Sequence, residues 1–130
     1  MTPNKRLNIS ITTVTTHLDS RSDSSSGQYA FGYAITLTNT GSIPARLLRR
    51  HWFVKSDNGH IQEVQGEGVI GEQPYLLPGE EPFQYTSWAM LQTPTGHMEG
   101  RFQFETDDGE KIWQEVPPFF FEVPGSRVIN

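Results

Sequence analysis

Apolar and polar residues alternate along much of the chain, and the alternation is clearest at residues 29–38. One set of alternate positions carries large side chains, namely Tyr29, Phe31, Tyr33, Ile35 and Leu37. The other set carries small ones, namely Ala30, Gly32, Ala34, Thr36 and Thr38. Because successive side chains of a strand point to opposite faces, this period predicts a β-strand with one buried face.

Similar short runs occur along the rest of the chain, separated by turn residues. Together they predict strands at residues 7–18, 29–38, 46–55, 60–65, 75–77, 83–88, 98–106, 111–116 and 119–123. The alternation shifts phase within the first run, which predicts a β-bulge near residues 12–13. Asn58-Gly59 predicts a hairpin turn, since both residues tolerate positive φ. Pro117-Pro118 is expected to end a strand, because proline cannot donate to a sheet ladder.

The spacing of these runs predicts the fold class. About seven to nine short strands, with turn signals every 8 to 12 residues or so, are typical of an antiparallel β-sandwich of the immunoglobulin-like or fibronectin type III-like class. No segment sustains a helical period, so we expect little or no helix. We expect one domain over residues 1–130, with a frayed lead-in at residues 1–6 and a Ser-rich loop at residues 19–28.

Composition excludes several classes of function. The sequence has no cysteine, which excludes disulfides, thiolate metal sites and cysteine nucleophiles. Its 15 acidic and 10 basic residues give a net charge of −5, which argues against nucleic acid as a partner. No apolar run is long enough to cross a membrane, and no secretory signal is recognisable, so we expect a cytoplasmic protein without a membrane partner.

Motifs for catalysis and metal binding are lacking. The histidines at positions 17, 51, 60 and 97 do not occur at metal-ligand spacings. No nucleophile elbow of the form G-x-S-x-G is present. We therefore predict no catalytic residues, no metal site and no cofactor.

The segment from Gly66 to Gly71 reads G-x-G-x-x-G, but its context is not that of a dinucleotide-binding fold. Pro74 follows it closely, and no strand–helix–strand unit surrounds it. Two interpretations remain. Either the glycines allow a tight crossing between two sheets, or the backbone N–H groups of Gly66, Gly68 and Gly71 bind an anion together with Arg49 and Arg50.

Arg50 itself has two interpretations. It shares a face with Trp52 by alternation, and a guanidinium buried beside that indole needs a carboxylate. We expect a structural ion pair with Glu67 or Glu63. The alternative is that Arg50 receives a phosphate or the carboxylate of a partner.

Aromatic residues supply the remaining candidates for an interface. Alternation places Phe119 and Phe121 on one side of the last strand and Phe120 on the other. Either both sides are covered by the core, or one side exposes aromatic surface to a partner or to a second copy of the chain. We group Trp88 with these residues as a candidate contact.

Several segments together resemble the ApaG family. They are YAITLTN at 33–39, LLRRHW at 47–52, QEVQGEGVIGEQP at 62–74, LPGE at 77–80, YTS at 85–87 and PPF at 117–119. The resemblance covers about residues 9–123 and implies a fibronectin type III-like sandwich. This family includes small bacterial proteins linked to magnesium and cobalt efflux, whose genes neighbour a diadenosine-tetraphosphatase, and domains of some eukaryotic F-box proteins. One departure is Trp88-Ala89-Met90, where the family pattern implies smaller residues, often Gly-Cys.

These observations lead us to expect a non-enzymatic binding module. Its partner would be a protein, with a second copy of the chain as one form of that partner. One alternative is a sensor of phosphate or nucleotide ligands, such as pyrophosphate or diadenosine polyphosphates, at Arg49, Arg50 and the glycine segment. The other alternative is direct binding of a divalent metal through histidines and carboxylates.

Overall fold

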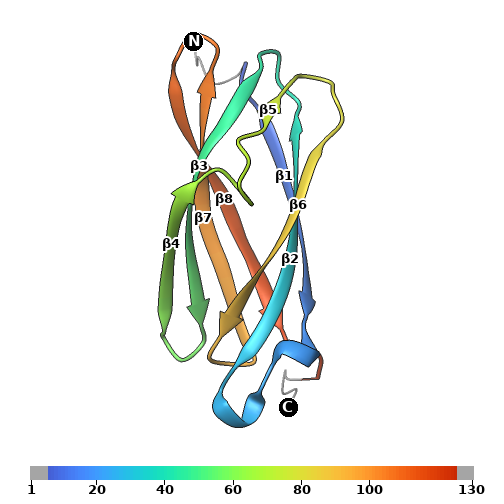
Figure 1. The fold of residues 1–130 in the computed structure, drawn as a ribbon, viewed down its shortest axis with the longest axis vertical. Coiled ribbons are helices and arrows are strands. Elements are labelled where there is room, and N and C mark those ends of the chain that lie inside the picture. Colours follow the sequence, from blue (N-terminus) through green and yellow to red (C-terminus); the bar gives the residue numbers. More distant parts are fainter. Residues whose placement is uncertain (1–5, 126–130) are drawn as a thin grey trace.

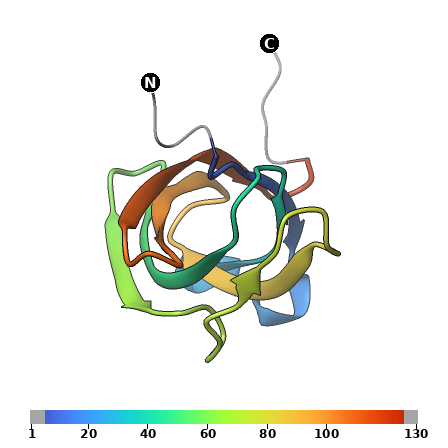
Figure 2. The same ribbon diagram turned by 90° about the horizontal axis from the view of Figure 1, so that it is seen from above.

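Two antiparallel sheets packed face to face make up the fold in the computed structural model, which describes residues 6–125 (Figure 1). The first sheet has the order β1 (Ile9–His17), β2 (Tyr29–Asn39) and β6 (Phe83–Leu91). The second has the order β4 (Ile61–Glu67), β3 (Ala45–Ser56), β7 (Thr95–Thr106) and β8 (Lys111–Glu122), and β5 (Tyr75–Leu76) also pairs with β3. Seen end on, the two sheets enclose one core (Figure 2). The predicted β-sandwich is confirmed.

The core lies between the sheets and is rich in aromatic rings. The large side chains of β2 point inward, as the alternation predicts. Phe31 of β2 stacks on Phe121 of β8 with ring centroids 5.0 Å apart. Trp52 of β3 lies edge-on to Phe119, with centroids 5.8 Å apart. Burial of each such ring stabilises the fold by roughly 1.5–3 kcal/mol.

The prediction of a bulge in β1 is wrong. The strand pairs with β2 without interruption from Ile9 opposite Asn39 to His17 opposite Phe31. Val14 therefore points outward and is 65% exposed. The apparent phase shift comes from an apolar residue on the outer face, which alternation alone cannot distinguish from a core residue.

A bulge occurs instead in β3, at Leu48. The register between β3 and β7 shifts between Leu47 and Arg49, so that Leu48 is an extra residue. Before the bulge Leu47 points into the core, and after it Trp52 does so. The bulge thus turns even-numbered side chains of β3 inward, including Arg50.

Pro117 and Pro118 do not end a strand, contrary to expectation. β8 runs through both prolines, opposite Glu99, where the register with β7 shifts between Met98 and Gly100. β8 is also at the edge of its sheet. Proline is tolerated at a bulge on an edge strand because no ladder hydrogen bond is lost there.

The Ser-rich loop is more regular than expected, since it contains the 3-10 helices η2 (Asp19–Arg21) and η3 (Ser24–Ser26). Neither is long enough to cross a membrane, and no other helix occurs in residues 6–125. The lead-in expected at residues 1–6 lies outside the described residues except for Arg6. The carbonyl of Arg6 accepts a hydrogen bond from the Ser42 N–H at 2.7 Å.

Candidate functional site

The glycine segment forms a tight turn at the edge of the second sheet. It connects β4 to β5, and both strands pair with β3, so the predicted crossing between sheets is not here. Val69 and Glu72 exchange backbone hydrogen bonds of 2.8 and 2.9 Å around Ile70 and Gly71. These two central residues have φ of +44° and +79°, which defines a type I′ turn.

The same segment is anchored on the bulge of β3. The Leu48 carbonyl accepts hydrogen bonds from the Gly68 N–H at 2.7 Å and from the Gln73 side chain at 3.1 Å. Backbone N–H groups of Gly68, Val69 and Glu72 therefore bind within the protein and do not face an anion. This geometry favours the structural interpretation of the glycines over an anion-binding nest.

The partners of Arg50 differ from those that the sequence predicts. Its guanidinium donates to the backbone carbonyls of Glu67, at 3.2 Å, and Gly68, at 2.9 Å. A Cβ at Gly66 would lie 2.7 Å from the guanidinium, so the glycine makes room for it. Arg50 lies on the inward side of β3, together with Trp52. Burial raises the pKa of Tyr33, and a hydrogen bond with Ser87 and the charge of Arg50 partly oppose this effect.

The carboxylates expected beside Arg50 have other partners. Glu67 pairs with Arg49 at 3.5 Å, and both side chains are exposed. Glu63 pairs with His51 at 2.6 Å. The expected ion pair of Arg50 is thus corrected: backbone carbonyls satisfy the guanidinium, and the acids pair on the outer surface.

Histidines and carboxylates do not gather into a metal site. Within residues 6–125, no group of three or more such side chains is placed to hold an ion. His51 faces the single carboxylate of Glu63, and His97 faces that of Glu99 at 3.1 Å. The direct metal-binding alternative therefore lacks a ligand set in the described part of the chain.

The four aromatic candidates divide into two pairs. Phe119 and Phe121 are buried in the core, so they do not form an exposed interface, contrary to our grouping. Phe120 is 68% exposed and Trp88 is 51% exposed. Only these two remain as candidate contacts.

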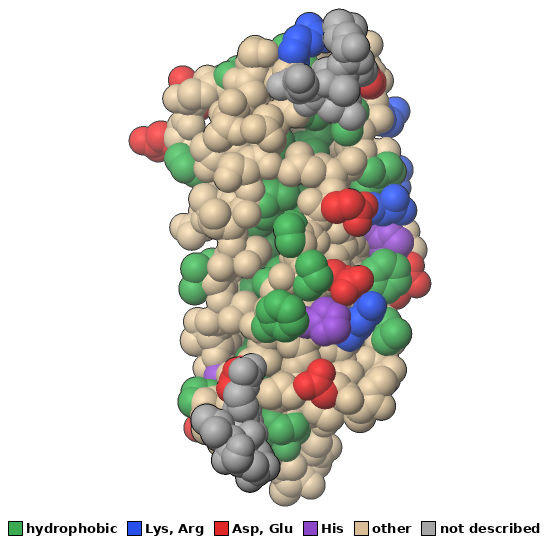
Figure 3. Space-filling model, turned by 180° about the vertical axis from the view of Figure 1, so that it is seen from behind, with side chains coloured by type: hydrophobic (Ala, Val, Ile, Leu, Met, Phe, Trp, Pro, Cys, Tyr) green, Lys and Arg blue, Asp and Glu red, His purple; other side chains and the backbone are tan. Residues whose placement is uncertain are grey.

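The outer faces of the two sheets differ in charge. All five ion pairs between described residues lie on the outer face of the β4-β3-β7-β8 sheet: Arg49–Glu67, His51–Glu63, Lys55–Glu99, His97–Glu99 and Lys111–Glu105. Seen from behind, acidic, basic and histidine side chains gather along one side of the molecule (Figure 3). By contrast, no outward position of the β1-β2-β6 sheet carries a charge; these positions are Ser10, Thr12, Val14, Thr16, Ala30, Gly32, Ala34, Thr36, Thr38, Gln84, Thr86, Trp88 and Met90.

A hollow of about 590 Å³ runs along the middle of this uncharged face. We call it the β2 groove, and its lining includes Val14, Thr16, Leu18, Arg21, Gly32, Ala34, Thr86 and Trp88. The groove exists because the outward side chains of β2 are small, whereas β1 and β6 on either side carry larger ones. Gly32 lies directly between Thr16 and Trp88 in the sheet register.

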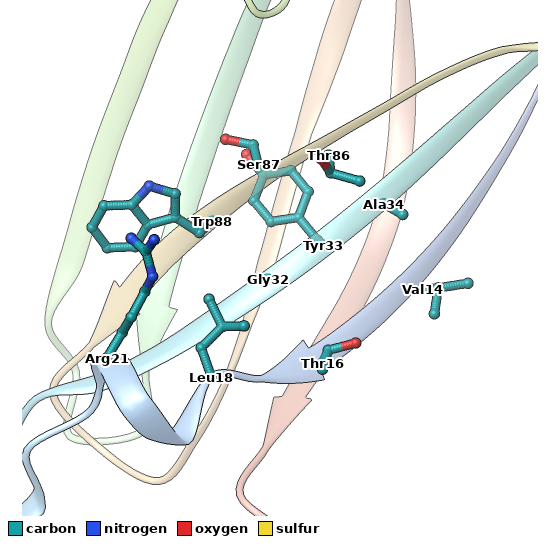
Figure 4. Close-up of a pocket in the computed structure, with 10 residues that line it drawn as sticks. All are labelled: Val14, Thr16, Leu18, Arg21, Gly32, Tyr33, Ala34, Thr86, Ser87 and Trp88. Carbon is teal, nitrogen blue, oxygen red and sulfur yellow. The ribbon is translucent and has the colours of Figure 1, made fainter.

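One end of the groove is closed by the loop after β1. There the side chain of Arg21 rises from η2 toward the ring of Trp88 (Figure 4). The hydroxyl of Ser22 fixes this loop on β2: it accepts from the Ala30 N–H at 2.9 Å and donates to the Leu18 carbonyl at 2.9 Å. Arg21 is the only charged residue of the lining, and it forms no ion pair with any residue between 6 and 125.

Comparison with known proteins places the chain in a family. Residues 19–106 match the family model described as the ApaG domain. The chain belongs to the ApaG family. It is 41% identical, over all 130 residues and the whole of both chains, to Protein ApaG of Aromatoleum aromaticum. It is also 45% identical to Protein ApaG of Rhodopseudomonas palustris over 123 residues, which are 94% of each chain.

A solved structure has the same fold. The crystal structure of a putative ApaA protein from Bordetella pertussis superposes with a TM-score of 0.88 at 36% identity, covering 95% of this chain and 100% of that one. The resemblance to the ApaG family that the sequence indicates is confirmed. Within the matched range lie Arg21, Gly32 and Trp88, which line the groove.

Sequence reasoning about this ApaG chain missed the groove, although its signals were present. The small outward residues of β2 and the aromatic Trp88 are visible in the sequence, as is the departure from the family pattern at Trp88. What could not be seen is that β6, some 50 residues further on, lies beside β2 and places Trp88 next to Gly32. Arg21 falls in a loop for which no period or motif predicts a position.

Proposed function

We propose that this ApaG chain is a non-enzymatic binding module whose protein partner covers the outer face of the β1-β2-β6 sheet. The observation that carries the proposal is the lack of charge on this face, combined with the exposure of Trp88. The centres of protein interfaces are depleted of charged residues and enriched in aromatic ones. An exposed sheet that presents Trp88 and Val14 without a charge fits that composition, whereas the ion-paired opposite face fits a solvated surface.

The other candidate functions have less support from the contacts. A phosphate or nucleotide sensor would need the Gly68 N–H and the Arg50 guanidinium, and both already bind within the protein. A metal sensor would need a ligand cluster that is not found among residues 6–125. In this proposal the module acts in the cytoplasm, and any link to magnesium and cobalt efflux runs through the protein partner.

Site-specific photocross-linking tests this proposal in cells. A photoreactive phenylalanine derivative replaces Thr86, on the uncharged face, or Gln103, on the outer face of the other sheet. We expect a cross-linked protein, either another species or a second copy of the chain, from position 86 and not from position 103. Trp88→Ser should abolish the product from position 86, since it removes the exposed ring but little buried area.

Phe120→Ser is the control, because it removes a ring that is even more exposed than Trp88 and lies outside the β2 groove. It should leave the product from position 86 intact. Cross-links from position 103 alone, or from neither position, would show that the uncharged face is not the binding face.

A further inference from the structure

The dimensions of the β2 groove suit an extended polypeptide. β1 and β6 each lie about 4.8 Å from β2, so their backbones are roughly 10 Å apart and their side chains narrow the groove further. Its floor is formed by Gly32 and Ala34. An α-helix with its side chains is about 10–12 Å wide and could not reach this floor, whereas an extended chain could.

The walls of the groove set the chemistry of such a segment. Leu18, Val14 and the ring of Trp88 are apolar, while Thr16 and Thr86 offer neutral hydroxyl groups. Aliphatic or proline side chains of a bound segment would pack against the indole and against Leu18, whose side chain lies beside Gly32. The backbone of β2 is already paired on both edges, so recognition would use side chains and not addition of a strand.

Arg21 determines which charge a bound segment should carry. It is the only charged group in the lining, no acid lies in the lining to neutralise it, and it has no ionic partner in residues 6–125. The Ser22 hydroxyl fixes its loop at the end of β2. The side chain of Arg21 is exposed, and a guanidinium complements a carboxylate, with which it can form two parallel hydrogen bonds.

We infer that the β2 groove binds an extended polypeptide segment with apolar residues against Leu18 and Trp88 and a carboxylate, from Asp, Glu or a chain terminus, at Arg21. This inference rests on the proposed function, because it specifies the partner that the uncharged face would bind. It adds that the bound segment is extended, that its apolar residues and its carboxylate lie in different parts of the groove, and that its charge is negative.

Selection from a phage-displayed library of random linear heptapeptides tests the inference on the purified full chain. We expect the selected peptides to be enriched in Asp or Glu and in apolar residues. Binding of a synthetic selected peptide should weaken by about tenfold or more in Arg21→Gln, the loss expected for one charge-assisted contact. Selection on Arg21→Glu should enrich Lys or Arg instead, a gain of specificity that a damaged fold would not produce.

A matched control separates local charge from total charge. Arg49→Gln removes an exposed arginine from the opposite sheet and should leave peptide binding unchanged. Circular dichroism of each variant checks that it is folded.

The remaining outcomes distinguish this inference from the proposed function. Peptides that depend on Trp88, tested with Trp88→Ser, but not on Arg21 would overturn the charge assignment and leave the binding face standing. Peptides insensitive to both substitutions, or the failure to select any, would overturn the groove as a peptide site. In that case the cross-linking experiment alone decides whether a protein covers the uncharged face.

Discussion

Ile70 is the residue whose backbone departs most from its side chain's preference. Its φ of +44° lies in the left-handed region, yet isoleucine is β-branched and its side chain is 55% exposed. Such a conformation costs a non-glycine residue roughly 1–2 kcal/mol. The turn at residues 69–72 therefore retains a residue that weakens the fold, and nothing in the contacts of the described residues explains why.

Ile70→Asn should stabilise the protein. Asparagine tolerates positive φ, and Asn-Gly is the preferred pair of a type I′ turn, so we expect the free energy of unfolding in urea to rise by about 1 kcal/mol. Ile61→Asn is the matched control, because Ile61 is also 55% exposed but lies in β4. There the same change should lower stability by up to about 1 kcal/mol. A decrease at position 70 would show that the turn conformation is wrong.

Asp108 illustrates how hydrogen bonds lower a pKa. The hydroxyl of Thr106 donates to its carboxylate and is the main cause that holds the pKa of Asp108 below its usual value of 3.8, and the N–H of Glu110 adds to the effect. The carboxylate therefore contributes to stability above about pH 4, and that contribution is lost as the pH falls through the lowered pKa.

Thr106→Val should raise the pKa of Asp108 toward its ordinary value, because the donor is removed while the side-chain shape is kept. NMR titration of the side-chain carboxyl carbons measures this change. Asp23 provides an internal control: hydrogen bonds from Ser25 and Ser26 lower its pKa, and it should titrate identically in both proteins. An unchanged curve for Asp108 would exclude Thr106 as the cause.

At the scale of elements, strands were easier to predict than the irregularities that orient them. The period of residues 29–38 gave β2 and its inward face correctly. The bulge at Leu48 was missed because an extra residue is recognised only against the partner strand, β7. It is this bulge that turns Arg50 inward, where the carbonyls of Glu67 and Gly68 satisfy it in place of a carboxylate.

The loop bearing η2 depends on one hydroxyl for its attachment to β2. Ser22→Ala should leave the N–H of Ala30, a fully buried residue, without its acceptor, and the cost of such a group is about 1–3 kcal/mol. We expect a loss of this size in urea unfolding, together with faster amide exchange at Ala30. Ser24→Ala, at an exposed position of the same loop, should change stability by less than about 0.5 kcal/mol. Equal effects of the two substitutions would show that the Ser22 hydroxyl does not attach the loop to β2.

At the scale of the whole molecule, the two sheets differ in the side chains that they expose to solvent. Ion pairs cover one outer face, whereas the other has no charge and a groove that ends at Arg21. Composition alone gives only the net charge of −5 and cannot assign charges to faces. The asymmetry arises because β1, β2 and β6 associate, and each of these strands alternates apolar residues with neutral ones.

Phe120 and Phe121 lie on opposite sides of β8, so substitutions at the two positions should change the free energy of unfolding by different amounts. Phe121→Ala empties a site stacked on Phe31 in the core and should lower the free energy of unfolding by about 3–5 kcal/mol. Phe120→Ala acts on the exposed face, where the change should stay below about 0.5 kcal/mol. Urea unfolding measures both. A large loss at position 120 would mean that its ring is covered in solution.

The sequence by itself determined the all-β class, the inward face of β2 and membership of the ApaG family, because alternation and local motifs depend on residues close together in the chain. Only the tertiary structure decided which carbonyls satisfy Arg50, that Phe119 and Phe121 are buried while Phe120 is not, and that Trp88 and Arg21 meet at one groove. These properties depend on which distant strands become neighbours and in what register. A shift of one residue in that register would move every side chain of a strand to the opposite face.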